Sequence, residues 1–236
     1  MNHRRPVARI NRPRPADTPP RPLPGRRIGL LGGSFNPAHA GHLAISRDAI
    51  RRLRLDRVWW LLSPQNPLKP VSGMASFADR LVKARALAAC DPRIVCSDLE
   101  QRLGTRYTVD TLRWLRPRSR ARLVWLIGAD NLLQLPQWRH WVRLLAMVPI
   151  AVFDREPYSY PATAGRVARV YAQRRLRERD APALAGCRPP AWVYLRLRRH
   201  QESGTAIRRA QTGSGRRAGE RSNRHRHGHG QAASKP

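Results

Sequence analysis

Two histidines and several glycines lie close together in the stretch GLLGGSFNPAHAGH, which begins in an apolar run. Gly32 and Gly33 allow the backbone to approach a ligand closely, and Gly41 does the same beside the start of a helix. His39 and His42 are three residues apart, so at a helix start their rings can converge on one spot. Paired imidazoles there can donate hydrogen bonds to phosphate oxygens and stabilise charge that builds up during phosphoryl transfer. The stretch therefore predicts a phosphate cradle.

Two other interpretations of this stretch remain open. Its spacing is neither G-x-G-x-x-G nor that of a Walker A motif, so an ordinary turn with solvent-facing histidines is one alternative. A metal site is the second, although no third ligand lies close by in the sequence. The N–H groups and the positive dipole end at a helix N-terminus favour the phosphate.

Apolar runs and helical patterns alternate through the middle of the chain. Continuous apolar runs typical of buried parallel strands occur at 27–32, 57–63, 93–98, 122–128, 148–154 and, less clearly, 191–197. Helical patterns lie between them, at 40–55, 75–90, 107–115, 136–147 and, as a longer element, 163–178. This order predicts an α/β protein with a parallel sheet covered on both faces. Ligands bind such sheets beyond the carboxyl ends of the strands, so the loops there are where chemistry is expected.

Composition separates a folded middle from two arms. Residues 1–26 are rich in Pro and Arg, and residues 210–236 are of low complexity, so both predict disordered basic arms around a single domain at 27–209. The net charge is +31, and almost all of it comes from arginine. This charge reflects either a genome that favours arginine codons or attraction of polyanions and phosphorylated small molecules.

Several classes of protein are disfavoured. The sequence contains no run of 18 apolar residues, the length needed to span a membrane. Its N-terminus lacks the apolar segment of a secretory signal. Cys90, Cys96 and Cys187 lack metal-ligand spacing, which indicates reduced thiols in a cytoplasmic protein. A nucleic-acid-binding protein would interleave aromatic and basic residues, whereas the tryptophans of 57–63 and 122–128 lie in apolar runs.

Further residues at predicted strand ends have types that suit a nucleotide. Lys69 follows the second strand in SPQNPLK, and Asp130 follows the fourth in IGADNL. Ser203, Thr205 and Arg208 in ESGTAIRR form a candidate second phosphate clamp at a helix start. Each has a structural alternative: a solvated loop charge, an acid that favours the helix dipole, or a chance pattern.

Six stretches, in order, resemble the bacterial nicotinate-nucleotide adenylyltransferases of the (H/T)-x-G-H nucleotidyltransferase superfamily. They are GGSFNPAHAGHL, VWWLLSPQNPLKP, YTVDTLRWL, IGADNLLQLPQWRHW, VFDRE and SGTAIR. The resemblance implies a Rossmann-like, doubly wound parallel sheet of the nucleotidyltransferase type. It also implies adenylyl transfer from ATP to nicotinate mononucleotide, with Mg²⁺ held mainly by the ATP phosphates and no metal ligand set on the protein. The acceptor phosphate would attack the α-phosphorus in line, without a general base.

The resemblance also assigns roles to individual residues. The implied catalytic residues are His39, His42 and Arg208. The residues implied to bind ATP and its phosphates are Gly32, Gly33, Ser34, Phe35, Gly41, Lys69, Asp130, Ser203 and Thr205. The residues implied to bind nicotinate mononucleotide are Tyr107, Thr108, Trp138 and Arg155. Thr108 as a helix cap and Trp138 as a core residue are the structural alternatives.

The chain departs from the family pattern at three places. Arg155 is kept in DREPY but the following glycine is missing, and Arg139 stands where an aromatic is common. An apolar helix expected after Arg208 is absent, which predicts a loss of stability more than of chemistry. Two other functions remain: another nucleotidyltransferase with a nicotinamide mononucleotide or other phosphorylated acceptor, and an arginine-rich nucleic-acid-binding protein. The oligomeric state is not indicated.

Overall fold

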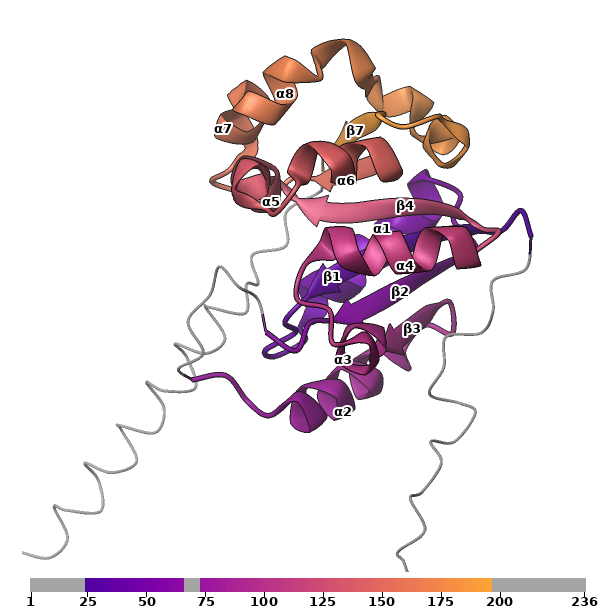
Figure 1. Cartoon of the computed structure of the whole chain (residues 1–236), viewed down its shortest axis with the longest axis vertical. Helices are drawn as coiled ribbons and strands as arrows, with labels where there is room; N and C mark the ends of the chain where they lie inside the picture. Colours follow the sequence, from indigo (N-terminus) through magenta and orange to yellow (C-terminus); the bar gives the residue numbers. More distant parts are fainter. Residues whose placement is uncertain (1–23, 66–72, 197–236) are drawn as a thin grey trace, which may run out of the picture.

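A seven-stranded sheet forms the centre of the computed structural model, which describes residues 24–65 and 73–196 (Figure 1). Its strands are β1 (Arg27–Gly33), β2 (Arg57–Leu62), β3 (Ile94–Ser97), β4 (Arg122–Gly128), β5 (Ile150–Phe153), β6 (Arg175–Leu176) and β7 (Trp192–Leu195). Every neighbouring pair is parallel, in the order β3-β2-β1-β4-β5-β7-β6. The predicted doubly wound parallel sheet is therefore confirmed, and all six predicted strands are present.

Part of the predicted site falls outside the structure's coverage. The residues in question are Lys69, Ser203, Thr205 and Arg208, together with 1–23 and 197–236. The second phosphate clamp, the loop lysine, the two arms and the effect of the C-terminal departure therefore stay predictions.

Each face of the sheet has its own core, because side chains alternate along a strand. Trp59 and Trp60 are neighbours in β2, yet Trp59 packs into one core and Trp60 into the other. Figure 1 shows α4 in front of the strands and α1 behind them. One face is covered by α1 (Ala40–Arg52), α2 (Phe77–Ala88) and the 3-10 helix η4 (Glu178–Gly186). The other is covered by α3 (Leu99–Leu103), α4 (Thr108–Arg118), α5 (Ala129–Gln134), α6 (Trp141–Met147), α7 (Ser159–Ala164) and α8 (Arg166–Val170).

The long helix predicted at 163–178 is wrong. Gly165 has an extended backbone, with φ −69° and ψ 169°, and it separates α7 from α8. After α8 the chain makes a short 3-10 turn, η3 (Ala172–Arg174), and then pairs as β6 with the edge of β7. The indole of Trp192 in β7 donates to the Tyr171 carbonyl at 2.8 Å, which fixes the end of α8. Pairing with the sheet therefore overrides the helical pattern.

The helix predicted at 136–147 also begins later than expected. A 3-10 turn, η2 (Leu135–Gln137), comes first, and α6 starts only at Trp141. Between them His140 has a left-handed backbone with φ 52°, which a continuous helix cannot contain. This break leaves Trp138, with an extended backbone, at the start of a turn between η2 and α6.

Two broader expectations can be compared with the described residues. None of the helices in this part of the chain is long and apolar enough to cross a membrane. Cys90, Cys96 and Cys187 are free thiols, as the sequence predicted.

Gly29 makes room for two leucines in the core behind β1. A Cβ added there would lie 2.7 Å from Leu55 Cδ1 and 2.9 Å from Leu126 Cδ1. We expect Gly29→Ala to lower the free energy of unfolding by about 1–3 kcal/mol through overpacking, measured by urea denaturation. Gly186→Ala is the control, because its Cβ would meet only Arg122 Nη1 at 3.6 Å. Equal stabilities of the two variants would contradict this account of the β1 packing.

Candidate active site

A cleft of about 250 Å³ opens at the carboxyl ends of the central strands, where the order reverses on the two sides of β1. This switch point is where doubly wound sheets bind ligands. Eleven of the predicted site residues line the cleft: Gly32, Gly33, Ser34, Phe35, His39, His42, Tyr107, Thr108, Asp130, Trp138 and Arg155. The sheet thus brings together side chains that are separated by more than 120 positions.

The two histidines form a reciprocal cap at the start of α1. His39 Nδ1 accepts a hydrogen bond from the Gly41 N–H at 3.2 Å, and His42 Nδ1 accepts one from the His39 N–H at 3.2 Å. The ring centroids are 3.9 Å apart, so the rings converge as predicted. A neutral imidazole whose Nδ1 accepts must carry its proton on Nε2. The helix start therefore makes Nε2 the donor atom of both rings, while Gly41 contributes its amide and does not line the cleft.

Phe35 holds the cradle in a conformation that is unusual for a non-glycine residue. Its φ is 46°, and its side chain is 1% exposed. The ring stacks on Trp60 with centroids 5.0 Å apart and lies 4.6 Å from the ring of His42. Left-handed backbone costs about 1 kcal/mol or more, and burial of the ring offsets this cost. The turn that presents His39 and His42 is therefore held by aromatic packing.

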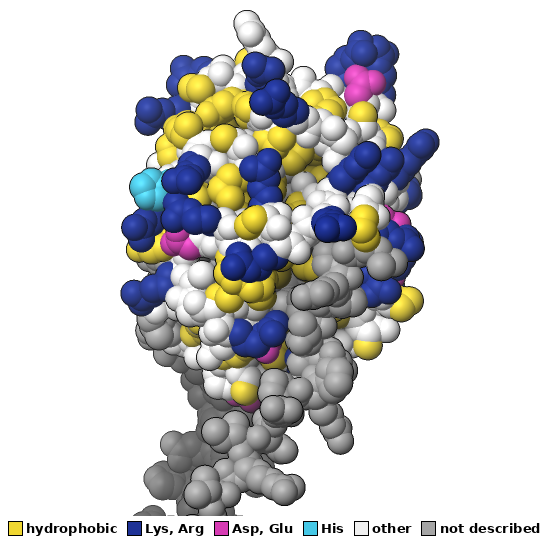
Figure 2. Space-filling model, turned by 45° about the vertical axis from the view of Figure 1, so that its right-hand side comes forward, with side chains coloured by type: hydrophobic (Ala, Val, Ile, Leu, Met, Phe, Trp, Pro, Cys, Tyr) yellow, Lys and Arg dark blue, Asp and Glu magenta, His cyan; other side chains and the backbone are white. Residues whose placement is uncertain are grey.

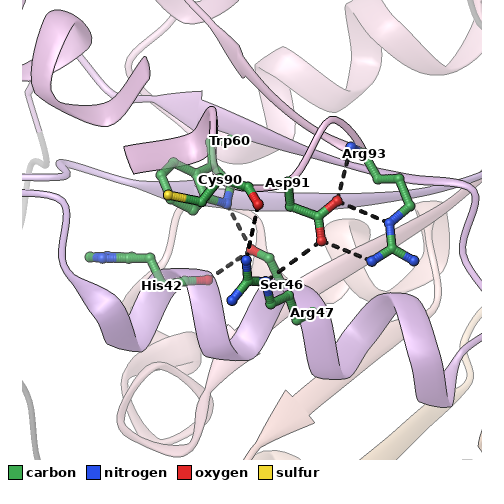
Figure 3. Close-up of polar contacts among 7 residues, drawn as sticks. All are labelled: His42, Ser46, Arg47, Trp60, Cys90, Asp91 and Arg93. Carbon is green, nitrogen blue, oxygen red and sulfur yellow. Dashed lines mark hydrogen bonds and ion pairs between the residues drawn. The ribbon is translucent and has the colours of Figure 1, made fainter. Parts of the chain in front are cut away.

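Helix α1 is anchored to β2 and to the turn after α2 by the polar contacts in Figure 3. The buried indole of Trp60 donates to Ser46 Oγ at 2.7 Å, and Ser46 Oγ donates to the His42 carbonyl at 2.8 Å. Arg47, one residue further along, donates to the Cys90 carbonyl at 3.0 Å. The Asp91 carboxylate accepts from Arg93 at 2.8 Å and lies 3.6 Å from Arg47. These contacts fix the position of α1, and with it that of the His42 ring.

Asp130 faces the cleft from the first turn of α5. Its Oδ2 accepts from Arg155 at 3.2 Å, whereas its Oδ1 is buried and has no hydrogen-bond partner among the described residues. A Cβ at Gly128 would lie 2.4 Å from that Oδ1, so the glycine leaves space for the carboxylate. Asp130 lines the cleft and has a carboxylate oxygen without a protein donor, which suits a ligand that brings a donor or a cation.

The N-terminus of α4 forms another part of the cleft wall. Tyr107 is the N-cap and Thr108 the first helical residue, and the Tyr107 side chain makes no capping bond. The first N–H groups of a helix have no partner within it, so they suit an anion. Trp138 lines the cleft as well, and the Arg139 guanidinium lies over the Tyr107 ring at 4.9 Å.

Glu100 also lines the cleft, and the sequence did not indicate it. It lies in α3, a helix of five residues that was not predicted, and it is 7% exposed. Burial raises its pKa to about 7, against the opposing effect of hydrogen bonds from Thr111 and Ser63. Near neutral pH this carboxyl therefore carries a proton for much of the time.

Charge in the cleft favours an anionic ligand. Arg106, Arg139 and Arg155 line it, while Asp130 and the partly protonated Glu100 are its acidic groups within the described chain. In the sequence, Arg139 stood out only as a departure from a family pattern, and nothing distinguished Arg106. In both cases the signal was hidden because arginine is common throughout the chain.

Comparison with known proteins agrees with this geometry. The sequence model of the cytidylyltransferase-like family matches residues 30–210. Two curated relatives, from Methylorubrum extorquens (strain PA1) and Bradyrhizobium sp. (strain ORS 278), are named "Probable nicotinate-nucleotide adenylyltransferase". They are 51% and 53% identical over 183 residues, which is 77% of this chain and 98% and 95% of theirs.

The chain belongs to the cytidylyltransferase-like family, in the group of the nicotinate-nucleotide adenylyltransferases. The resemblance inferred from the six stretches is therefore confirmed. A solved structure of Plasmodium falciparum nicotinic acid mononucleotide adenylyltransferase with NaAD aligns with a TM-score of 0.60. It is 13% identical and covers 78% of this chain and 83% of its own, so it supports the fold alone. A complex of the same parasite enzyme with APC aligns with a TM-score of 0.57.

Glu100 should make stability depend on pH. Its pKa is raised from 4.5 to about 7 in the folded protein, so between these values the folded state holds a proton that the unfolded chain releases. The contribution of Glu100 to the free energy of unfolding is therefore fully present below pH 4.5. It is lost as the pH rises through 7, which lowers the free energy of unfolding by about 3 kcal/mol in total. We expect Glu100→Gln to remove this slope in urea denaturation between pH 5 and 8.

Glu156→Gln, at an exposed position, serves as the control and should keep the wild-type dependence of stability on pH. Asp91 does not interfere, because Arg93 lowers the pKa of that carboxyl to about 2, below the tested range. If Glu100→Gln kept the wild-type slope, protonation of Glu100 in the folded state would be ruled out.

Proposed function

We propose that this protein transfers the adenylyl group of ATP to nicotinate mononucleotide, giving nicotinate adenine dinucleotide and pyrophosphate in NAD biosynthesis. The observation that carries the proposal is the reciprocal cap of His39 and His42, which directs two imidazole donors to the switch-point cleft. The names of relatives that are 51% identical over most of their length support the choice of substrates.

The reaction needs positioning and charge stabilisation more than proton transfer. An oxygen of the acceptor phosphate attacks the α-phosphorus of ATP in line, and the bond to the bridging oxygen breaks, so that pyrophosphate leaves with the electron pair. The acceptor phosphate is already ionised near neutral pH, so no general base is required. The Nε2–H groups of His39 and His42 donate to phosphate oxygens as negative charge develops there. Backbone N–H groups of the cradle at Gly32, Gly33 and Ser34 bind the same ligand.

Asp130, after β4, binds ATP, and Arg155, after β5, donates to Asp130 and binds nicotinate mononucleotide. Mg²⁺ in such sites is held by one or two carboxylates together with substrate phosphates. Asp130 supplies one carboxylate to the cleft lining, which fits an ion that arrives with ATP, and Asp130 is the residue that would meet it. The ion would neutralise phosphate charge. We also assign Lys69, Ser203, Thr205 and Arg208 to the phosphates, on the sequence alone.

The acceptor is recognised at the N-terminus of α4. Trp138 stacks on the pyridine ring, and the first amides of α4, at Tyr107 and Thr108, bind the nicotinate carboxylate. The positive surroundings supplied by Arg106 and Arg139 disfavour the neutral amide of nicotinamide mononucleotide.

We place the protein in the cytoplasm, where its free thiols would stay reduced. Binding of nucleic acid is disfavoured, because Trp59, Trp60 and Trp125 are at most 1% exposed and offer no stacking surface. Figure 2 shows basic side chains scattered over the visible face without a continuous stripe.

The deciding experiment is pyrophosphate release from ATP and Mg²⁺ with either mononucleotide as acceptor. We expect release with nicotinate mononucleotide and a preference for it over the amide. His42→Ala should lower kcat by about 10²–10³-fold, the usual effect of removing one donor to a developing charge. The control is His140→Asn, which removes an exposed imidazole at a left-handed position that asparagine tolerates. Release with nicotinamide mononucleotide alone would overturn the assigned acceptor, and equal rates in His42→Ala would overturn the mechanism.

Gly128→Ala tests the position of the Asp130 carboxylate. The added Cβ would displace Oδ1, which lies 2.4 Å from it, so we expect kcat/KM for ATP to fall about 10-fold with little change in stability. The same substitution in an Asp130→Asn background should have a much smaller effect, because both changes act on one group. Additive losses would show that Gly128 acts by another route.

A further inference from the structure

Arg80 is a charged side chain that α2 directs into the protein interior. Helix α2 packs Phe77, Leu81 and Leu87, partly buried, against the core, and its fully buried residues are Arg80, Ala84 and Ala88. Arg80 is 1% exposed. A guanidinium this deeply buried must bring partners or a function with it, because arginine is rarely buried unless it is paired.

Every hydrogen bond that the structure gives Arg80 goes to a backbone carbonyl. Nη1 donates to the Ser34 carbonyl and, at 2.9 Å, to that of Ser63. Nη2 donates to the Pro64 carbonyl at 2.9 Å, and Nε to the Ala75 carbonyl at 3.2 Å. One side chain therefore joins the loop after β1, the loop after β2 and the segment before α2.

These carbonyls lie where the ladder between β1 and β2 ends. The last bond across the two strands runs from the Ser63 N–H to the Gly33 carbonyl, at 2.9 Å. The paired register stops at Gly33 and Leu62, and Arg80 donates to the next carbonyl after each strand, at Ser34 and Ser63. The N–H groups of the guanidinium thus join the two segments by hydrogen bonds just beyond the point where the strands stop pairing.

The two loops joined in this way both reach the cleft. Ser34 and Ser63 line it, whereas Arg80 is not among its lining residues in the described chain. Asn36 makes a second tie from the cradle to the same segment before α2. Its Nδ2 donates to the Gly73 carbonyl and its Oδ1 accepts from the Ala75 N–H, both at 3.3 Å.

The charge of Arg80 has no carboxylate partner among the described residues. Their ion pairs involve other arginines, and burial is the cause that lowers the pKa of its guanidinium. An arginine stays protonated in proteins all the same, so a positive charge is retained behind the cradle. Four carbonyl dipoles offset part of its desolvation cost. An apolar side chain at this position would remove the donor from four carbonyls, so Arg80 contributes to stability, and a contribution to the reaction has to be measured separately from it.

We propose that Arg80 is a positioning residue for adenylyl transfer: its guanidinium holds the cradle after β1 at a fixed separation from the loop after β2. The inference rests on the proposed function. The cradle carries Ser34 and leads into His39 and His42, so a change in its separation from the second loop shifts these donors relative to the phosphates. A misplacement of about 1 Å is enough to cost about 100-fold in rate.

Lysine cannot replace the fork of Arg80. An ammonium has three donors on a point charge, whereas the planar guanidinium spans four carbonyls on three segments. Arg80→Lys therefore keeps the charge and loses the geometry, and Arg80→Met loses both. Lys83→Met, on the exposed side of the same helix, is the matched control.

The test measures kcat and KM for both substrates in full-length variants, at a temperature where circular dichroism shows each to be folded. We expect kcat of Arg80→Lys and Arg80→Met to fall about 100-fold, with KM for nicotinate mononucleotide within about 3-fold of wild type and Lys83→Met unchanged. A purely structural role would change the melting temperature and leave kcat per folded molecule unaltered. Wild-type kcat in folded Arg80→Lys would overturn the proposal. Failure of both Arg80 variants to fold would also overturn it, because Arg80 would then be a determinant of folding.

Failure of the proposed function would look different. Wild-type protein would then release no pyrophosphate with either acceptor. Calorimetric binding of ATP needs no acceptor, and we expect it to weaken about 10-fold in Arg80→Met and remain unchanged in Lys83→Met. Unchanged ATP binding in a folded Arg80→Met would count against Arg80 even in that case.

Discussion

The pairing of β1 with strands on both sides is the constraint on which the site depends. β2 and β3 extend the sheet in one direction and β4, β5, β7 and β6 in the other. The connection from β1 to β2 through α1 covers one face, and the connection into β4 through α3 and α4 covers the other. Their divergence opens a crevice at the carboxyl end of β1, where the glycine-rich turn emerges. Side chains from α1, α4 and the segment after β4 meet there only because one parallel ladder holds their strands in register.

Backbone groups supply much of the site's order. The imidazoles of His39 and His42 are oriented by amides at the start of α1. Arg80 satisfies carbonyls just beyond the ladder. In both cases a polar side chain completes hydrogen bonding where regular structure ends, and such ends cannot be left unsatisfied inside a protein. The geometry of the candidate site therefore follows from the need to satisfy backbone groups at the ends of two strands and one helix.

The electrostatics of the cleft suit a ligand with several negative charges. Arginines line it, and of its acidic groups Glu100 is held largely protonated by burial while Asp130 contacts Arg155. Family membership narrows this ligand to nucleotides, since relatives at about half identity match over nearly their whole length. Cleft chemistry and family thus agree through independent observations.

From the sequence alone we could predict six of the seven strands and the glycine-histidine turn, and the resemblance of six stretches indicated the family. Apolar runs and a glycine-histidine spacing are patterns within a few neighbouring residues, so they can be recognised without knowing the tertiary contacts. The sequence could not show that Gly165 interrupts the helical pattern. The stabilisation comes from pairing β6 with β7, a strand that follows 17 residues later. Nor could the sequence single out Glu100 and Arg80, whose burial results from packing against distant segments. Only the tertiary structure decided which of the chain's many charged residues became interior groups, because burial and hydrogen-bond partners are properties of the folded whole.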